Sequence, residues 1–155
     1  MPTLQFSKNI RKRGRQFDNS RTQLVRSVAK RGLRSLVNQT KADTAKARSN
    51  WRVGVGSPTR AVIEPYSPYK KGSKADGLGI GERANAIATI RAGNARINAT
   101  KGVSGVGLTT AIFITNNVDY INKALLPGAI EVATLEARSV VAGFRLFRNN
   151  SGEFD

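Results

Sequence analysis

The sequence predicts an α+β fold in which a long N-terminal helix and a C-terminal helix pack on a small, mostly antiparallel β-sheet. Three observations predict it: apolar residues at helical spacing over 7–38, a change to a period of two at Trp51, and a run of β-branched residues over 108–115. At 155 residues the chain is long enough for one domain with its own core. We divide it into a basic arm (residues 1–18), one α+β domain (residues 19–148) and a tail (residues 149–155).

The first segment has no Pro between residues 7 and 38, and its apolar residues recur three, four and seven positions apart. This spacing places them on one stripe of a helix with Arg and Lys around the rest. Gly14 and the run 18–20 are candidate breaks, since Asn19 or Ser20 is a favoured N-cap residue. We therefore expect a helix over about 19–38 and a helical or adaptable arm over 7–17.

The next stretch carries the chain from helix to sheet. Asp43 or Thr44 caps a short helical turn over 45–48, and alternation then puts Trp51, Val53 and Val55 on one face of a strand. Because the alternation partners of Trp51 are apolar, we assign it to the core. A turn at 56–58 and apolar residues at 61–63 predict a hairpin over 51–64.

Residues 65–80 form a loop because they hold two Pro and three Gly. Such long loops in compact domains are commonly functional. Its aromatic and basic residues make it a candidate docking loop for a partner or a phosphate backbone: Tyr66, Tyr69, Lys70, Lys71 and Lys74.

The second half of the chain predicts a helix over 82–97, with Gly93 as a weak point or an early stop. A strand follows over 108–115, then a short element at 119–121. A last helix begins at Ala129 and reaches as far as Phe147.

The charge is concentrated in one half of the chain. Of a net charge of +16, residues 1–75 carry 18 Lys and Arg against 3 Asp and Glu, and the remaining residues carry 8 against 7. Such asymmetry indicates a polyanion or an acidic protein surface as partner. The cluster Arg11, Lys12, Arg13 and Arg15 is either a solvated helix end or a contact with such a partner.

The composition argues against an enzyme, a metal site, a disulfide-linked protein and a membrane protein. The chain has no His and no Cys, which removes the commonest general base, the commonest metal ligand and any disulfide. Its carboxylates show no paired spacing, so we expect no enzyme, no cofactor and no metal. We also expect neither a signal peptide nor a membrane span, because no apolar run is long enough.

Two motifs resemble a known family. Residues 43–51 read Asp-Thr-x-x-Ala-Arg-Ser-Asn-Trp after a helix, and residues 114–121 read Ile-Thr-Asn-Asn-x-x-Tyr-Ile before Pro127-Gly128 and a last helix. In this order they resemble the tail-completion, or neck, proteins of tailed bacteriophages over about residues 20–145. Two positions depart from the family pattern: Ala45 stands where Gly is usual, and the segment between Ile121 and Pro127 is short.

The resemblance implies a structural virion protein without catalytic role, in which copies form a ring, commonly six-fold, between portal or adaptor and tail. It implies that Asp43 and Thr44 let the chain leave the helix for the sheet, and that Tyr120 packs beside the assembly interface. The expected partners are other copies, the portal or adaptor and tail proteins, with non-specific DNA contact and no membrane. The expected location is the virion, after assembly in the host cytoplasm.

The alternative interpretation is a nucleic-acid-binding protein that contacts phosphates through its basic N-terminal half. The two interpretations overlap, since a neck ring surrounds the DNA channel, and the arm could meet either DNA or acidic protein.

Overall fold

The computed structural model describes residues 2–41, 45–67, 80–100 and 111–144. They form a mostly helical α+β fold that confirms the predicted class. In chain order the elements are α1 (Pro2–Asn38), α2 (Ala45–Ser49), β1 (Arg52–Val55), α3 (Ile80–Ala99), β2 (Ile112–Thr115), α4 (Ile121–Ala124) and α5 (Ala129–Gly143).

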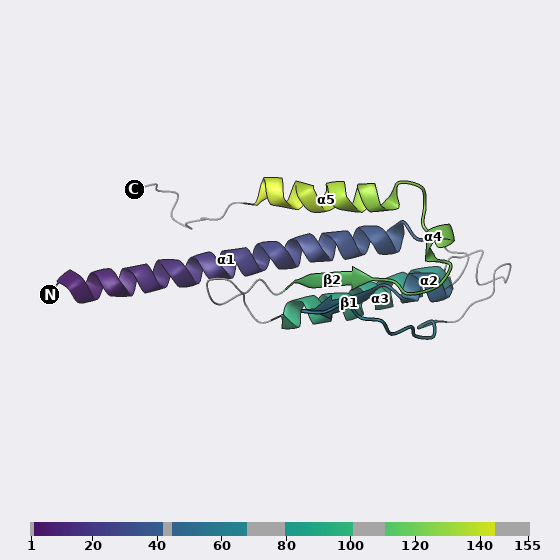
Figure 1. The fold of residues 1–155 in the computed structure, drawn as a ribbon, viewed down its shortest axis with the longest axis horizontal. Coiled ribbons are helices and arrows are strands. Elements are labelled where there is room, and N and C mark those ends of the chain that lie inside the picture. Colours follow the sequence, from purple (N-terminus) through teal and green to yellow (C-terminus); the bar gives the residue numbers. More distant parts are fainter. Residues whose placement is uncertain (1, 42–44, 68–79, 101–110, 145–155) are drawn as a thin grey trace.

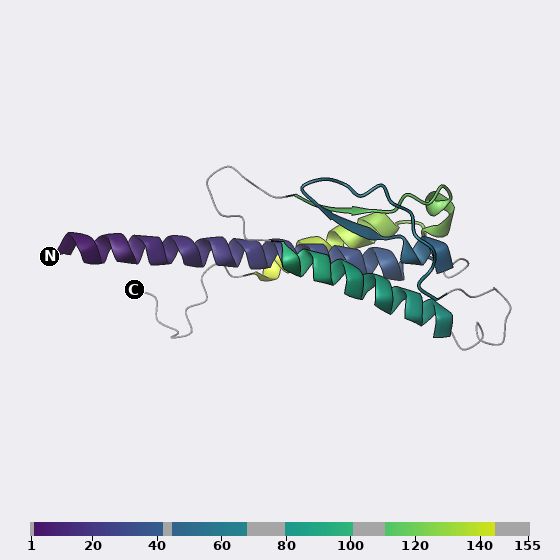
Figure 2. The same ribbon diagram turned by 90° about the horizontal axis from the view of Figure 1, so that it is seen from below.

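Helix α1 is the centre of the molecule. It runs between α5 on one side and the sheet and α3 on the other (Figure 1), and the sheet and α3 flank it on two sides in the second view (Figure 2). The core joins α1, the sheet and α3: Ala29, Leu33 and Val37 of α1 meet Trp51 and Val53 at β1 and Ile97 of α3. The second half of α1 is therefore inside the domain, whereas its first half projects beyond it (Figure 1).

The predicted break in the first segment is wrong, because α1 is one helix about 55 Å long. The Thr22 hydroxyl donates a hydrogen bond to the Asp18 carbonyl at 2.8 Å, which ties residue 18 into the helix that continues beyond it. Gly14 costs about 1 kcal/mol relative to Ala, too little to interrupt flanking turns rich in Arg and Lys.

The predicted hairpin over 51–64 is also wrong. Strand β1 pairs antiparallel with β2, in a register that sets Arg52 opposite Thr115 and Val55 opposite Ile112. Residues 57–64 form no strand, because Pro58 lacks a donor and side chains hold the segment instead. Thr115 donates a hydrogen bond to the Thr59 carbonyl at 2.8 Å, and Asn50 bonds both the N–H and the carbonyl of Ile63.

The other elements differ from expectation mainly at their ends. The strand predicted over 108–115 is found at Ile112–Thr115, and residues 108–110 lie outside the described residues. Helix α5 begins at Ala129 as predicted and ends at Gly143. The short element predicted at 119–121 is found as α4, which begins at Ile121. The helical turn predicted over 45–48 is found as α2, which begins at Ala45. Trp51 and Val53 are buried as predicted, but Val55 is 38% exposed at the end of the strand.

Gly93 is neither a weak point nor a stop, because α3 continues through it to Ala99. A β-carbon at this position would lie 2.3 Å from a methyl group of Leu33 and 3.1 Å from one of Val53. The missing side chain therefore allows α3 to approach α1 and β1 closely.

Two buried helical glycines give a matched test of this packing. We expect Gly93→Ala to destabilise the domain by about 1–3 kcal/mol through overpacking, although Ala favours a helix. Gly32→Ala in α1 should stabilise it by up to about 1 kcal/mol, since its new β-carbon would only touch Ile114 at 3.8 Å. Urea unfolding measures both, and equal effects would contradict the close approach at Gly93.

Candidate assembly surfaces

The predicted basic cluster lies on the projecting half of α1. The side chains of residues 5–17 are all exposed, including Arg11, Lys12, Arg13 and Arg15. At about 100° per residue, Lys8, Arg11, Lys12 and Arg15 lie on one face of the helix. We call these four residues the basic face; Arg13 lies away from it.

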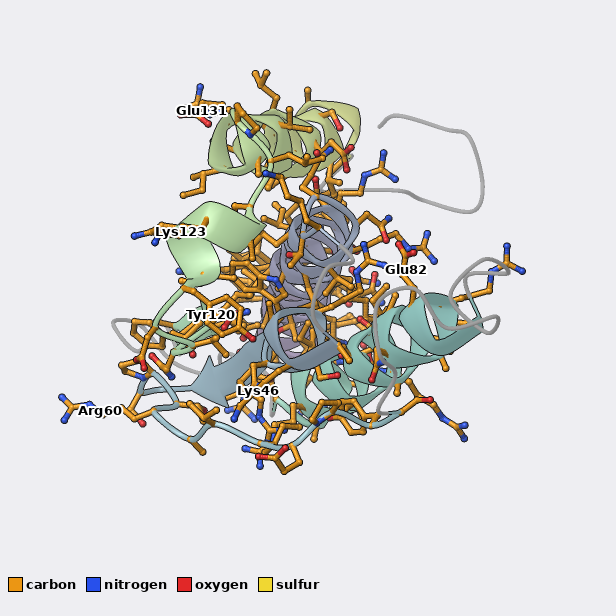
Figure 3. The ribbon with its side chains drawn as sticks, turned by 90° about the vertical axis from the view of Figure 1, so that its right-hand side faces the viewer. Lys46, Arg60, Glu82, Tyr120, Lys123 and Glu131 are labelled. Carbon is orange, nitrogen blue, oxygen red and sulfur yellow. The ribbon has the colours of Figure 1, made fainter. Side chains whose placement is uncertain are left out.

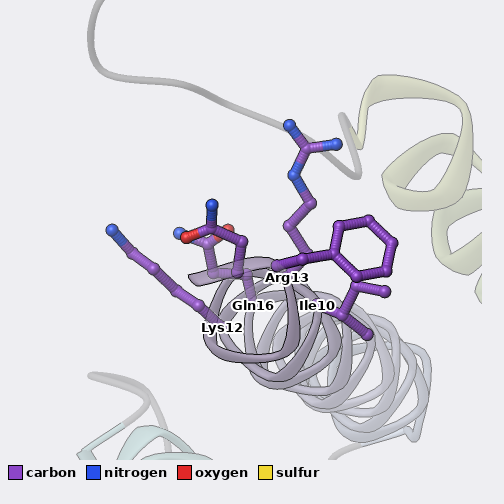
Figure 4. A pocket seen from close by; sticks show the side chains of 6 residues that line it. Ile10, Lys12, Arg13 and Gln16 are labelled. Atoms are coloured by element: carbon purple, nitrogen blue, oxygen red, sulfur yellow. The ribbon is translucent and has the colours of Figure 1, made fainter. Parts of the chain in front are cut away.

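The opposite side of the arm is apolar. Phe6 is 66% exposed and Ile10 is 54% exposed, and Phe17 lies on the same stripe. Figure 4 shows Ile10 and Arg13 projecting from one side of the helix and Lys12 from another. Phe6, Asn9 and Gln16 line the same shallow pocket. The arm is thus an amphipathic helix with a basic face and an apolar face.

An apolar groove of about 560 Å³ lies between α1, α5 and β2. Sequence reasoning missed it, because its walls come from three segments distant in the chain. Leu24, Val25, Val28, Ala29, Gly32 and Leu36 contribute from α1, and Ile112 and Ile114 contribute from β2. The wall from α5 consists of Ile130, Ala133, Thr134, Ala137, Arg138 and Val141.

Helix α5 carries apolar residues on its exposed sides as well as on the side that packs against α1. Its buried residues are Ala129 and Ala133, and an ion pair between Arg31 and Glu136 at 3.0 Å ties it to α1. Ile130 and Val141, at 61% and 51% exposure, stand in the wall of the groove, while Leu135, at 63%, lies on the other side of the helix. The run of apolar residues that predicted the last helix therefore also forms an exposed surface.

The predicted docking loop is described only in part. Tyr66 is 43% exposed, and Tyr69, Lys70, Lys71 and Lys74 lie outside the described residues. Tyr120 is 36% exposed and precedes the first residue of α4. Tyr120 and the arm stand at opposite ends of the molecule, so the structure does not bring these candidates into one site (Figures 1 and 3).

The motif that ends at Trp51 is structural where the structure describes it; Asp43 and Thr44 fall outside that part. The indole N–H of Trp51 donates a hydrogen bond to the Thr40 hydroxyl at 2.8 Å, and the Arg48 guanidinium donates to the Thr40 carbonyl and pairs with Glu82. Arg48 therefore links Thr40, just after α1, to α2 and α3, and Trp51 links it to the start of β1.

Asn85 of α3 holds the start of the loop. Its amide nitrogen donates hydrogen bonds to the Ser67 carbonyl at 2.7 Å and the Gly81 carbonyl at 2.8 Å. Its oxygen accepts from the Ser67 N–H at 2.9 Å and the Ser49 hydroxyl at 2.8 Å. With no exposed surface, this side chain satisfies four polar groups inside the protein.

The described residues show neither a metal-binding group nor a membrane-spanning helix. They contain no group of three or more Asp and Glu placed to hold a metal ion. Among the same residues, no helix is both long and apolar enough to cross a bilayer. Comparison with family models, with curated proteins and with solved structures gave no match.

We expect Asn85→Ala to lower the free energy of unfolding by about 3 kcal/mol, because the buried polar groups of Ser49, Gly81 and Ser67 would lose their hydrogen-bond partner. Asn98→Ala, at an exposed site of the same helix, should change it by less than about 0.5 kcal/mol. Thermal unfolding of the two variants measures the difference, and a small effect at Asn85 would argue against its role.

Proposed function

We propose that this chain is a structural protein of the neck of a tailed phage, whose copies form a ring that joins the portal or adaptor to the tail. A six-fold ring is the expected form. In this proposal the chain is not an enzyme and needs no cofactor; it assembles in the host cytoplasm and resides in the virion.

The observation that carries the proposal is the exposed apolar surface. Phe6, Ile10, Ile130 and Leu135 are each more than half exposed. Ile130 stands in the wall of the apolar groove, Leu135 lies on the other side of α5, and Phe6 and Ile10 lie on the arm. Apolar surface exposed on this scale is typical of proteins that bury it against other proteins. Assembly therefore accounts for this surface better than a soluble monomeric role.

The resemblance in the two motifs supports a neck ring as the particular assembly. Arg48 and Trp51 of the first motif bond Thr40, just after the long helix ends, while Ser49 bonds Asn85 of α3 and Asn50 bonds Ile63. In the second motif, the Asn116 amide donates a hydrogen bond to the Ala47 carbonyl at 2.7 Å. The two motifs therefore meet in space and support one common joint.

Electron microscopy of the assembled particle, with this chain labelled, tests the proposal. We expect the label in a closed ring at the junction of head and tail. In purified form the protein should sediment as an oligomer of defined size. A chain that is strictly monomeric in the assembled particle contradicts the proposal.

A second candidate function is non-specific binding to the phosphate backbone, favoured by the basic face of the arm. That face, Lys8, Arg11, Lys12 and Arg15, is solvent-exposed and points away from the apolar stripe. Lys and Arg in this arrangement could contact successive phosphates while the apolar face contacts protein.

We expect any binding to double-stranded DNA to weaken with salt, with a log–log slope of about −0.9 for each phosphate neutralised. Replacing Arg11, Lys12 and Arg15 by Ala should make the slope shallower by up to about 3. The control replaces Arg83, Arg91 and Arg96 on the exposed surface of α3, which removes the same charge. Identical slopes for both variants, measured by fluorescence anisotropy, would rule out the arm as the binding element.

A further inference from the structure

We infer that the apolar face of the arm docks into the groove between α1, α5 and β2 of a second copy of this chain. This inference rests on the proposed ring and names the contact that builds it. The arm is the N-terminal part of a helix that is continuous with the core, and its first half projects beyond the domain (Figure 1). The described residues of the same chain leave Phe6 and Ile10 more than half exposed, so we assign their burial to another molecule.

The groove continues the stripe to which Phe6 and Ile10 belong. Leu24 and Val28 lie on the same side of α1, and there α5 of the same chain packs beside them. The helix face that α5 partly covers in the domain is thus the face that the arm exposes. Amphipathic helices commonly bind in apolar grooves through side chains spaced as Phe6 and Ile10 are.

Length and apolar character agree with this docking. The stripe from Phe6 to Phe17 extends about 16 Å along the helix axis, and the groove wall from Leu24 to Leu36 extends about 18 Å. Both surfaces are apolar, and both contain side chains that are more than half exposed in the single chain.

Charge selects the groove over a second arm as the partner. Two arms packed through their apolar faces would bring Arg13 of each copy close to the other, which is unfavourable. In the groove the basic face points outward and stays hydrated. Only Arg13 comes to the rim, where Glu131 of α5 is exposed on the groove side and projects outward (Figure 3).

Charge also sets the direction of the arm. Arg13 is attracted to Glu131 at the start of α5 and repelled by Arg138 near its end. The arm therefore runs antiparallel to α5, with Asn9 level with Thr134 and Leu135. Because the arm and the groove are different surfaces, the contact is head-to-tail, and repetition of it closes a ring if the rotation permits.

Cysteine pairs test the contact directly, since the chain has no cysteine of its own. An Asn9→Cys chain mixed with a Thr134→Cys chain should form a disulfide-linked heterodimer under mild oxidation, because Thr134 lines the groove at that height. The matched control mixes Asn9→Cys with Leu135→Cys, because Leu135 lies at the same height on α5 but faces away from the groove. Equal cross-linking of the two mixtures, or none in the first, overturns the inference.

Sedimentation of charge-reversed chains provides the second test. We expect Arg13→Glu to weaken association about three- to tenfold. Glu131→Arg in the same chain should restore it. Arg15→Glu, the same change on the basic face, should leave association unchanged. Ile10→Asp, which places a carboxylate in the groove, should weaken association by more than about a hundredfold.

The outcomes separate this inference from the proposed function. Rings that survive Ile10→Asp overturn the arm-in-groove contact and leave the ring proposal standing. A wild-type chain that is monomeric at high concentration and in the particle overturns both.

Discussion

The structure depends on the hydrogen bonds that meet at Thr40, just after α1 ends. Its hydroxyl accepts from the Trp51 indole and donates to the Leu36 carbonyl at 2.8 Å, and its own carbonyl accepts from Arg48. A β-bridge between Thr40 and Leu125 adds the segment before α5. One buried residue thus fixes α1, α2, β1 and the approach to α5 relative to one another. An apolar residue here would leave the Trp51 indole N–H and the partners around it unsatisfied, which is costly in a buried site.

Hydrophobic periodicity predicted the fold class and the type of most elements, because each helix has a face that packs in the core. Periodicity could not predict the roles of individual glycines. Gly14 stands in an exposed helix with open space around it, Gly32 touches Ile114, and Gly93 lies against Leu33. These environments arise from the distance between helices. A local sequence window contains no such information.

The missed strand pairing has a similar cause. Local turn signals favoured a hairpin, yet side chains of Asn50 and Thr115 bond the backbone of 59–63 and take the place of strand hydrogen bonds. Of the candidate surfaces, too, one could be predicted from a local stretch of sequence and the other could not. The basic cluster was visible as a run of charges, whereas the groove needed three segments brought together by folding. Apolar residues predicted the last helix, but packing covers only one side of α5.

In the proposed arm-in-groove contact, a continuous α1 gives the arm a mechanical role that a flexible tail would lack. Ordering a disordered segment on binding costs free energy for every residue fixed, whereas a preformed helix has lost that freedom already. The same rigidity restricts where the arm can point, because its direction follows from the packing of Leu33 and Val37 in the core. A change in that packing would therefore rotate the arm relative to the groove. The buried contacts around Gly93 and Thr40 would in this way set the angle between neighbouring copies, and hence whether a head-to-tail chain of contacts closes.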